Sequence, residues 1–519
     1  KTVGVLLVGP SSSFMKYIER VLPSLGETGV VMASVGRLMP GIHAVAEPEA
    51  DVAAIKGRLD MAGVVANAVA NRQRIPAANR ILEVDGRKLV LTPRQVRRAR
   101  DRARSTGKPH NEARVSFVKI LLRELTEQMT ELVEAGSIGT NADRSYLAED
   151  VRSARDVRIA LNLCWMPMTP EKLIGELLSR PAILEACTPG LSPAERELLL
   201  RPADAPWTES DVPLLDEAAE LLGELDAAAG RGLAQQEHDR ARDLANAKQT
   251  LVNMETAGVD VLISAEELVD QNQEREARLT AAERATTDRS WAFGHIVVDE
   301  AQELSPMQWR LLVRRCPLKS FTIVGDIAQT SSVAGANSWH GALAPMFGDR
   351  WQLEELTVNY RTPSQIAEAA ARMANAAGLV VSAPKAVREG RWAPVIDRVE
   401  PGQIINKLVE VLPQELDSLE GGLLAVIADG DLLPEATAAL RAVYGRRVGT
   451  DAGSYVQDIV VISPREAKGL EFDGVVVLEP SAMLNHEHGR VGDLYVAMTR
   501  PTQRLRLIAA AGVPAGIED

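Results

Sequence analysis

Residues 295–308 of the sequence, HIVVDEAQELSPMQ, decide the fold prediction, because an apolar run ends abruptly in two carboxylates. Residues 296–298 predict a buried strand, and Asp299 and Glu300 follow it directly. In a parallel sheet, side chains at the carboxyl end of a strand face the crevice where α/β proteins bind ligands. Taken alone, the pair has two interpretations: a ligand-binding site, or a solvated strand end beside a helix cap.

Strand and helix patterns alternate around this stretch. In a first block we predict strands at 3–9, 29–35, 295–299 and 320–326, with helices at 14–26 and 305–316. In a second block, after residue 345, we predict helices at 365–378 and 490–501 and strands at 421–429, 458–463 and 472–480. This alternation is typical of parallel sheets covered by helices. We therefore predict an α/β protein with two α/β blocks.

A long helical pattern separates the two halves of the first block. A hairpin precedes it, because the Asp85-Gly86 pair between apolar runs favours a two-residue turn. From residue 95 onward we predict helices and no strong strand until the α/β pattern returns. The predicted borders are 1–94 and 289–345 for the first block, 95–288 for the helical insertion, and 346–519 for the second block.

The insertion carries separate basic and acidic segments. Residues 94–123 contain ten Lys or Arg against two Asp or Glu, and residues 181–230 contain eleven Asp or Glu against two Arg. Three interpretations of the basic segment stay open: a phosphate-binding surface, a solvated amphipathic helix, or a surface that pairs with the acidic segment. Trp207, in the acidic segment, either anchors a partner protein or packs on its own helices.

Composition limits the class of protein. The formal net charge of −13 argues against non-specific coating of nucleic acid, which depends on neutralised phosphates, but it leaves room for a local basic groove. The scattered cysteines Cys164, Cys187 and Cys316 fit a reducing cytoplasm without a disulfide framework. No apolar run reaches the roughly 20 residues of a membrane span. Because a strand begins almost at residue 1 and no Met precedes it, we expect a fragment of a longer protein.

Further loops carry residue types that bind nucleotides. After the strand at 320–326, Gly325 permits close backbone approach, Asp326 is a capping residue, and Gln329 is placed to reach a γ-phosphate. Tyr360 and Arg361 stand together before a helix. A tyrosine ring stacks on a base, and an arginine binds phosphate through two hydrogen bonds.

The second block supplies the remaining candidates. Lys468, Gly469 and Glu471 occupy a loop between two apolar strands. Arg500 ends the last predicted helix, where Pro501 stops it, and is placed as an arginine finger across an interdomain cleft. These positions complete a candidate nucleotide site.

Five of these stretches resemble motifs of superfamily 1 helicases of the UvrD/Rep type, in the family order. They are VVDEAQ (297–302), VGDIAQ (324–329), LTVNYRTP (356–363), EAKGLEFDGVVV (466–477) and LYVAMTRPTQRL (494–505). The resemblance implies two RecA-like domains of the P-loop NTPase type, with the helical insertion in the first, and ATP and Mg²⁺ as cofactors.

The resemblance also implies a role for each site residue. Asp299 would coordinate Mg²⁺, and Glu300 would activate the attacking water. The γ-phosphate would be sensed by Gln329, Arg361 and Arg500. Adenine would stack on Tyr360, the ribose would contact Glu471, and Lys468 and Gly469 would complete the nucleotide-binding set.

Three departures from the helicase pattern narrow the family. No G-x-x-x-x-G-K-[ST] phosphate loop occurs in the sequence, so the chain as given should bind ATP poorly. The loop is expected upstream of residue 1, or Lys1 and Thr2 are its remnant. Only residues 364–465 separate the motifs LTVNYRTP and EAKGLEFDGVVV, which leaves no room for the second insertion with which processive relatives contact duplex DNA. The acidic insertion suits the basic channel of a partner protein.

With these departures the chain resembles the HelD family of the actinobacterial type, helicase-like ATPases that bind bacterial RNA polymerase. The stretches GVLLVGPSSSFMKYIERVLPSLGETGV and PHNEARVSFVKILLREL carry this resemblance over the insertion and the first block. It implies binding to the polymerase core, at its β and β′ subunits and main channel, and displacement of nucleic acid, DNA or RNA, from stalled or inactive complexes. Some relatives protect the polymerase against rifamycins. A cytoplasmic protein, monomeric outside the complex, is expected.

Two alternatives remain. One is a repair helicase of the UvrD/Rep type, which predicts ATP hydrolysis stimulated by single-stranded DNA and aromatic residues along a groove. The low aromatic content of 4% disfavours it. The other is a binding protein with a decayed catalytic site.

Overall fold

The computed structural model describes residues 4–9, 15, 30–136, 144–225, 288–289, 291–330, 332–379, 381, 385–450, 457–484 and 491–517. The helix predicted at 14–26 and the pair Lys1-Thr2 lie outside these residues. Contacts divide the chain into two compact units. Unit 1 comprises Lys1–Gly41, Pro48–Gly57 and Arg284–Asp519, and unit 2 comprises Ile42–Glu47 and Arg58–Glu283.

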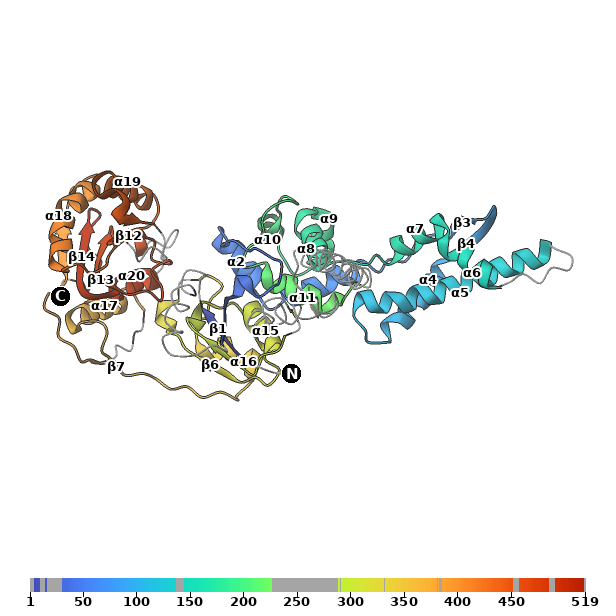
Figure 1. Cartoon of the computed structure of the whole chain (residues 1–519), viewed down its shortest axis with the longest axis horizontal. Coiled ribbons are helices and arrows are strands. Elements are labelled where there is room, and N and C mark those ends of the chain that lie inside the picture. The colour runs from blue at the N-terminus through green and yellow to red at the C-terminus, as the bar shows by residue number, and fades with distance from the viewer. Residues whose placement is uncertain are drawn as a thin grey trace, which may run out of the picture. The chain divides into compact units, whose positions relative to one another are not determined.

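The first sheet of unit 1 is parallel and has the strand order β2-β1-β5-β6 (Figure 1). Its strands are β1 (Val5–Gly9), β2 (Val30–Ser34), β5 (His295–Val298) and β6 (Phe321–Ile323). The associated helices are η2 (Val35–Arg37), α2 (Ala50–Gly57), η3 (Ala301–Glu303), α15 (Pro306–Arg315), η4 (Ile327–Gln329) and α16 (Trp339–Phe347). All four predicted strands of this block are confirmed. The register places the carboxyl ends of β5 and β6 side by side.

The second sheet of unit 1 is also parallel, with the order β11-β12-β10-β13-β14-β9. Its strands are β9 (Val395–Arg398), β10 (Leu424–Ile427), β11 (Val448–Gly449), β12 (Ile459–Ile462), β13 (Phe472–Leu478) and β14 (Pro501–Ala509). A separate parallel pair consists of β7 (Val358–Asn359) and β8 (Lys385–Ala386). The parallel α/β architecture predicted from the sequence is thus present in both sheets.

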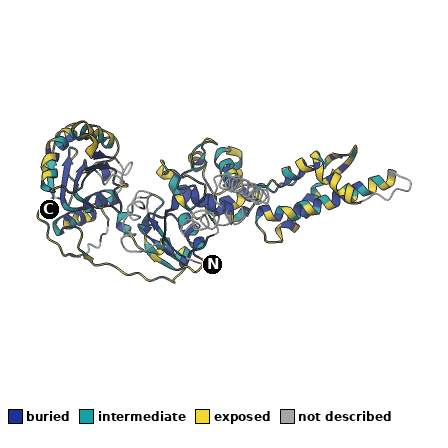
Figure 2. Ribbon diagram, in the orientation of Figure 1, coloured by how far each residue is buried: buried dark blue, intermediate teal, exposed yellow. Residues whose placement is uncertain are grey.

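Helices cover both faces of the second sheet. They are α17 (Ser364–Ala376), α18 (Ile404–Ser418), α19 (Leu432–Tyr444), η5 (Gly445–Arg447), η6 (Ala482–Leu484) and α20 (Val491–Thr499). Along β10, Ala425 and Ile427 join the core with α17 and α20, whereas Leu424 and Val426 join the core with α18 and α19. Figure 2 shows these strands as buried. Burial on both faces explains why the strand sequences are continuously apolar rather than alternating.

An ion cluster lies under α18 in the second sheet. Glu415 is 1% exposed, and both of its oxygens accept hydrogen bonds from the Arg504 guanidinium, at 2.7 and 2.9 Å. Arg506 donates to the same carboxylate at 2.7 Å and pairs with Asp397. Burial raises the pKa of Glu415, but the hydrogen bonds and charges of the two arginines outweigh it and leave the pKa lowered.

Unit 2 is mainly helical. Its helices are α3 (Met61–Ala70), α4 (Pro93–Arg104), α5 (His110–Gly136), α6 (Arg144–Ser153), α7 (Arg155–Cys164), α8 (Pro170–Ser179), α9 (Pro181–Cys187), α10 (Pro193–Leu199) and α11 (Val212–Leu222). The predicted hairpin is confirmed as β3 (Arg80–Val84) and β4 (Arg87–Leu91), antiparallel, with φ values of 47° at Asp85 and 70° at Gly86. Positive φ at both central residues is characteristic of the type I′ hairpin turn, which an Asp-Gly pair favours.

The hairpin belongs to the core of unit 2. Its inward side chains Leu82 and Leu89 are buried in one cluster with Phe117 and Leu121 of α5. Contacts therefore assign the chain from Arg58 onward to unit 2, whereas the sequence analysis placed residues 58–94 in the first α/β block. A short amphipathic hairpin does not reveal from its own pattern which neighbour covers its apolar face.

Trp207 packs within its own unit. The Arg201 guanidinium lies 4.9 Å from the centre of its ring, and the Trp207 carbonyl accepts a hydrogen bond from the Val45 N–H at 2.9 Å. Of the two interpretations offered for this residue, packing on its own unit is the one observed. Among the described residues, no helix is long and apolar enough to cross a membrane.

Candidate active site

The carboxylate pair stands at the junction of β5 and η3. The Asp299 N–H donates to the Val8 carbonyl, which extends the sheet by one residue, and Glu300 then adopts a left-handed conformation with φ 50° and ψ 41°. A non-glycine residue in this conformation is uncommon and marks a position that the surrounding structure dictates. The turn ends the strand and places the Glu300 side chain at the carboxyl edge of the sheet.

Gln302 fixes the Glu300 carboxylate. Its side chain is fully buried, and its Nε2 donates to Glu300 Oε2 at 2.6 Å. Its Oε1 accepts from the Asp326 N–H at 3.1 Å, across the gap between β5 and β6. One amide therefore connects the two strand ends. Gly325 makes this possible, because a Cβ there would collide with Gln302 Oε1, as the sequence analysis expected of a close-approach glycine.

The end of β6 forms a second polar turn. Asp326 accepts hydrogen bonds from the Ala328 N–H at 2.9 Å and from Gln329 Nε2 at 2.9 Å, which confirms its predicted role as a cap. Because the Gln329 Nε2 donates to Asp326, the Oε1 atom of the same amide points away from that carboxylate. This places an acceptor at the edge of the first sheet, facing residues of the second.

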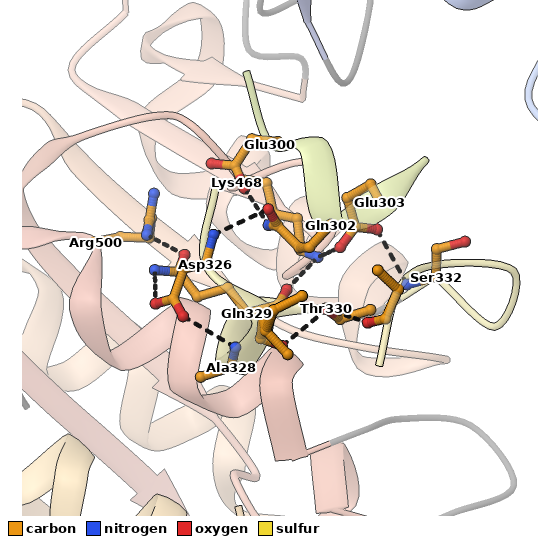
Figure 3. A network of polar contacts seen from close by, with 12 residues as sticks. Glu300, Gln302, Glu303, Asp326, Ala328, Gln329, Thr330, Ser332, Lys468 and Arg500 are labelled. Carbon is orange, nitrogen blue, oxygen red and sulfur yellow. Dashed lines mark hydrogen bonds and ion pairs between the residues drawn. The ribbon is translucent and has the colours of Figure 1, made fainter. Parts of the chain in front are cut away.

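Two cations of the second sheet meet these turns (Figure 3). Arg500, 4% exposed at the end of α20, donates to Gln329 Oε1 at 2.9 Å. Lys468, also 4% exposed, donates to Glu303 Oε1 at 2.6 Å and to the Gln329 carbonyl at 2.8 Å. The turns after β5 and β6 in the first sheet therefore each bind a buried cation that belongs to the second sheet.

A close backbone approach supports these contacts. At Gly492, near the start of α20, an added Cβ would lie 2.7 Å from the Thr330 carbonyl oxygen. Only glycine allows α20 to come so near the loop after η4.

The structure pairs two other predicted residues with each other. Arg361 Nη2 lies 2.7 Å from Glu471 Oε1, and both side chains are more than 40% exposed. Tyr360 is 77% exposed, which leaves its ring free to stack, and Gly469 has a φ of 73° in the loop before β13. The predicted phosphate ligand and the predicted ribose ligand thus neutralise each other in this structure, as an exposed pair of small energetic value.

The electrostatics of the carboxylates follow from burial. Burial raises the pKa of Glu300, and the negative charge of the neighbouring Asp299 raises it further. The charge of Arg500 and the hydrogen bond from Gln302 lower the same pKa, but burial is the largest effect. Burial also raises the pKa of Asp299, opposed by the Glu300 N–H and by the charge of Arg361. Burial lowers the pKa of Arg500, opposed by Glu300. A carboxylate with a raised pKa is a stronger proton acceptor than an ordinary one.

The Asp299 carboxylate fits the Mg²⁺ role that the resemblance assigns to it. Its Oδ1 accepts the Glu300 N–H at 2.8 Å, and within the described part of the chain Oδ2 accepts no hydrogen bond. A half-buried oxygen of this kind suits Mg²⁺, which proteins often bind through one carboxylate, with phosphates and waters completing the shell. No group of three or more metal-binding side chains occurs among the described residues.

Three functional candidates escaped the sequence analysis. Gln302 orients Glu300, and Glu303 binds Lys468 while also accepting the Ser332 N–H at 3.0 Å. Tyr495 lies near Asp326 and Arg500, and burial, followed by the charge of Asp326, raises its pKa to about 12. The signal for Gln302 was present, because a polar residue two positions after Glu300 lies within reach of the strand end.

Comparisons with known proteins give partial likenesses. No protein-family model and no curated protein matches the chain. It is similar to the C-terminal domain of a possible DNA helicase from Lactobacillus plantarum WCFS1, with 22% identity and a TM-score of 0.25, over 31% of this chain and 92% of that one. It is also similar to arterivirus nonstructural protein 10, a helicase in complex with DNA, with 17% identity and a TM-score of 0.24, over 42% of this chain and 40% of that one. At such TM-scores these likenesses carry no argument about function.

Proposed function

We propose that the chain is a helicase-like ATPase of the HelD kind, which binds the core of bacterial RNA polymerase and displaces nucleic acid from stalled or inactive complexes. Its contacts are the β and β′ subunits and the main channel, in the cytoplasm. ATP and Mg²⁺ are its cofactors, and hydrolysis recycles the polymerase.

The hydrolytic part rests on one observation: Glu300, Gln329 and Arg500 belong to a single network of partly buried hydrogen bonds. In phosphoryl transfer, a protein mainly positions the reactants and stabilises charge. Glu300, with its raised pKa, accepts a proton from water as the water oxygen attacks the γ-phosphorus and the bond to ADP breaks. Gln329 orients that water, and Arg500 stabilises the charge on the transferred group.

Three further residues bind the nucleotide. Tyr360 stacks on adenine, and Glu471 exchanges its contact with Arg361 for one with the ribose. Arg361 then turns to the γ-phosphate. Lys468 and Gly469 shape the loop beside it. Because the Arg361–Glu471 pair is exposed, breaking it costs little.

The polymerase-binding part rests on the organisation of the chain. Over the described residues, the segment between Arg361 and Lys468 contains only β8, α17 and elements of the second sheet with its helices. It therefore offers no added domain for unwinding duplex DNA. Unit 2, inserted into the first α/β block, is the part that enters the partner.

Replacement of Glu300 by Gln tests the hydrolytic part. In a chain that also carries the phosphate loop, the variant should bind a fluorescent ATP analogue as the parent does, while phosphate release falls by at least about 100-fold. Retained turnover would remove Glu300 from its assigned role. If a chain that carries the phosphate loop neither binds nor hydrolyses ATP, a non-enzymatic binding protein with a decayed site becomes the better interpretation.

A pull-down tests the partner. The chain is mixed with core RNA polymerase at ~0.15 M salt, beside a parallel sample with single-stranded DNA. Stoichiometric capture of polymerase with weak DNA binding is the expected result. Tight binding of single-stranded DNA, stimulated hydrolysis and no polymerase would favour the repair-helicase alternative.

A further inference from the structure

The helix α4 in unit 2 is built so that one face is fixed inward. Thr92 and Gln95 form a capping box at its start, with Thr92 N–H to Gln95 Oε1 at 2.9 Å, and Pro93 occupies the first turn. Its inner side chains Val96, Ala99 and Ala103 are fully buried in the core shared with α5. Small inner side chains bring α4 close to α5 and determine which residues face outward.

The outer face consists largely of arginine. The helix carries six arginines and one aspartate in twelve residues. At about 100° per residue, Arg97 and Arg104 lie on one flank of the outward face, Arg98 and Arg102 on the other, and Arg94 between them. All five are exposed.

The described part of the chain neutralises little of this charge. Arg98 pairs with Glu124 at 2.5 Å, and Arg100 pairs with Asp101 at 2.9 Å. Among the described residues no acidic partner is found for Arg94, Arg97 or Arg102. Arginines four apart repel each other and weaken the helix, so the sequence keeps a locally unfavourable arrangement at this place.

Among the described residues, the acidic segment of unit 2 forms no ion pair with α4. Its Glu195 pairs with Arg58 at 2.7 Å, and its Asp211 pairs with Arg201 at 2.7 Å. Of the interpretations left open for the basic segment, pairing with the acidic segment is therefore not observed.

We propose that the outward face of α4 binds the backbone of duplex DNA. Arginine matches phosphate through two parallel hydrogen bonds. Cations on both flanks of one helix face can contact the two strands that border a groove. The B-form major groove, about 12 Å wide, admits a helix, whereas that of A-form RNA is deep and narrow. The helix carries no aromatic residue on which single-stranded bases would stack.

This binding is independent of sequence and sensitive to salt, because its contacts go to phosphates. It stands on unit 2 alone and does not depend on the proposed hydrolysis. Asp101 faces the same side as the arginines and opposes the phosphate charge there.

The test compares two triple variants of the full chain. Arg94→Gln, Arg97→Gln and Arg102→Gln remove three charges from the face. The control variant, Arg155→Gln, Arg158→Gln and Lys172→Gln, removes three exposed charges from α7 and α8 of the same unit. Binding to a labelled 20-base-pair DNA is measured by fluorescence anisotropy across a range of KCl concentrations, with melting temperatures as the check on folding.

The α4 variant should bind duplex DNA at least about tenfold more weakly at 0.15 M salt, and the slope of log affinity against log salt should shrink by roughly 2 to 3. The control variant should behave as the parent chain. Asp101→Asn should bind more tightly, which a variant that merely unfolds cannot do.

Three results would overturn the proposal. The first is equal weakening in both triple variants. The second is a larger loss of affinity for duplex RNA or single-stranded DNA than for duplex DNA in the α4 variant. The third is a loss of polymerase capture with DNA binding unchanged, which would identify an acidic protein surface as the partner of this face.

Discussion

Replacing Gln302 by Met should weaken unit 1 and change the titration of Glu300. Methionine has a similar volume and no amide. The change therefore removes the donor to Glu300 Oε2 at 2.6 Å and the acceptor for the Asp326 N–H at 3.1 Å, two hydrogen bonds made by a side chain that is itself 0% exposed.

The expected loss is about 2–5 kcal/mol of unfolding free energy, because a buried polar group left without a partner costs about 1–3 kcal/mol and the bond to a charged oxygen is the stronger one. For a domain of this size this lowers the melting temperature by roughly 5–15 °C. Scanning calorimetry provides the measurement.

Gln365→Met is the matched control. Gln365 makes two amide hydrogen bonds to the backbone of Gly390, at 3.0 and 2.8 Å, and its Oε1 also accepts one from the Ser364 hydroxyl at 3.3 Å, but its side chain is only partly buried and bonds no carboxylate. Water can take over those bonds. The control should lose about 0.5–2 kcal/mol, without dependence on pH.

The pH dependence separates orientation of Glu300 from simple packing. The folded-state pKa of Glu300 is raised, so its contribution to stability is greatest below the ordinary carboxyl pKa and falls as the pH rises through the folded value. Gln302 favours the charged form, so the cost of Gln302→Met should grow as the pH rises through the raised folded-state pKa of Glu300. In a Glu300→Gln background this growth should vanish. A cost that is constant with pH, or unchanged by that background, would refute the reasoning.

Three other predictions concern stability. Glu415→Leu should lower the unfolding free energy by about 3–5 kcal/mol, because it leaves two buried arginines without their carboxylate, whereas Glu410→Leu on the exposed side of the same helix should cost less than about 1 kcal/mol. Since the pKa of Glu415 is lowered, the difference between the two variants should disappear as the pH falls below the ordinary carboxyl range. Equal costs in the two variants would contradict the burial argument. Lys468→Met removes the ion pair with Glu303 and the hydrogen bond to the Gln329 carbonyl, so it should increase hydrogen exchange at 327–330, and unchanged exchange there would contradict this. Gly492→Ala should lower the free energy of unfolding by about 1–3 kcal/mol, measured as a lower urea midpoint, because the added Cβ would lie too close to the Thr330 carbonyl oxygen. An unchanged midpoint would mean that α20 can move away from this loop without cost.

The parallel sheets were predictable because their signal is local. Each strand of the second sheet is buried on both faces, so a short apolar run bounded by polar residues is sufficient to identify it. The turn at Asp85 and the capping role of Asp326 were equally local. In each case the residues that form the strand or turn are the same residues that show the sequence signal for it.

The arrangement of the site was only partly predictable. Glu300, Gln329 and Arg500 stand at recognisable positions in the sequence, but nothing in the spacing indicates that Gln302 connects two strand ends or that Arg361 contacts Glu471. Those contacts depend on register and side-chain direction, which a linear pattern does not contain. The assignment of residues 58–94 depends for the same reason on which core receives Leu82 and Leu89.

The contact of Arg500 with the first sheet has a consequence for measurement. Coulomb attraction between Arg500 and Glu300 falls as the two charges separate, and the proton affinity of Glu300 rises accordingly. Glu300 therefore reports, through its own protonation, how near the second sheet stands to the first. Spectroscopic titration of this single carboxyl group would follow the approach of the two sheets without a label on either one.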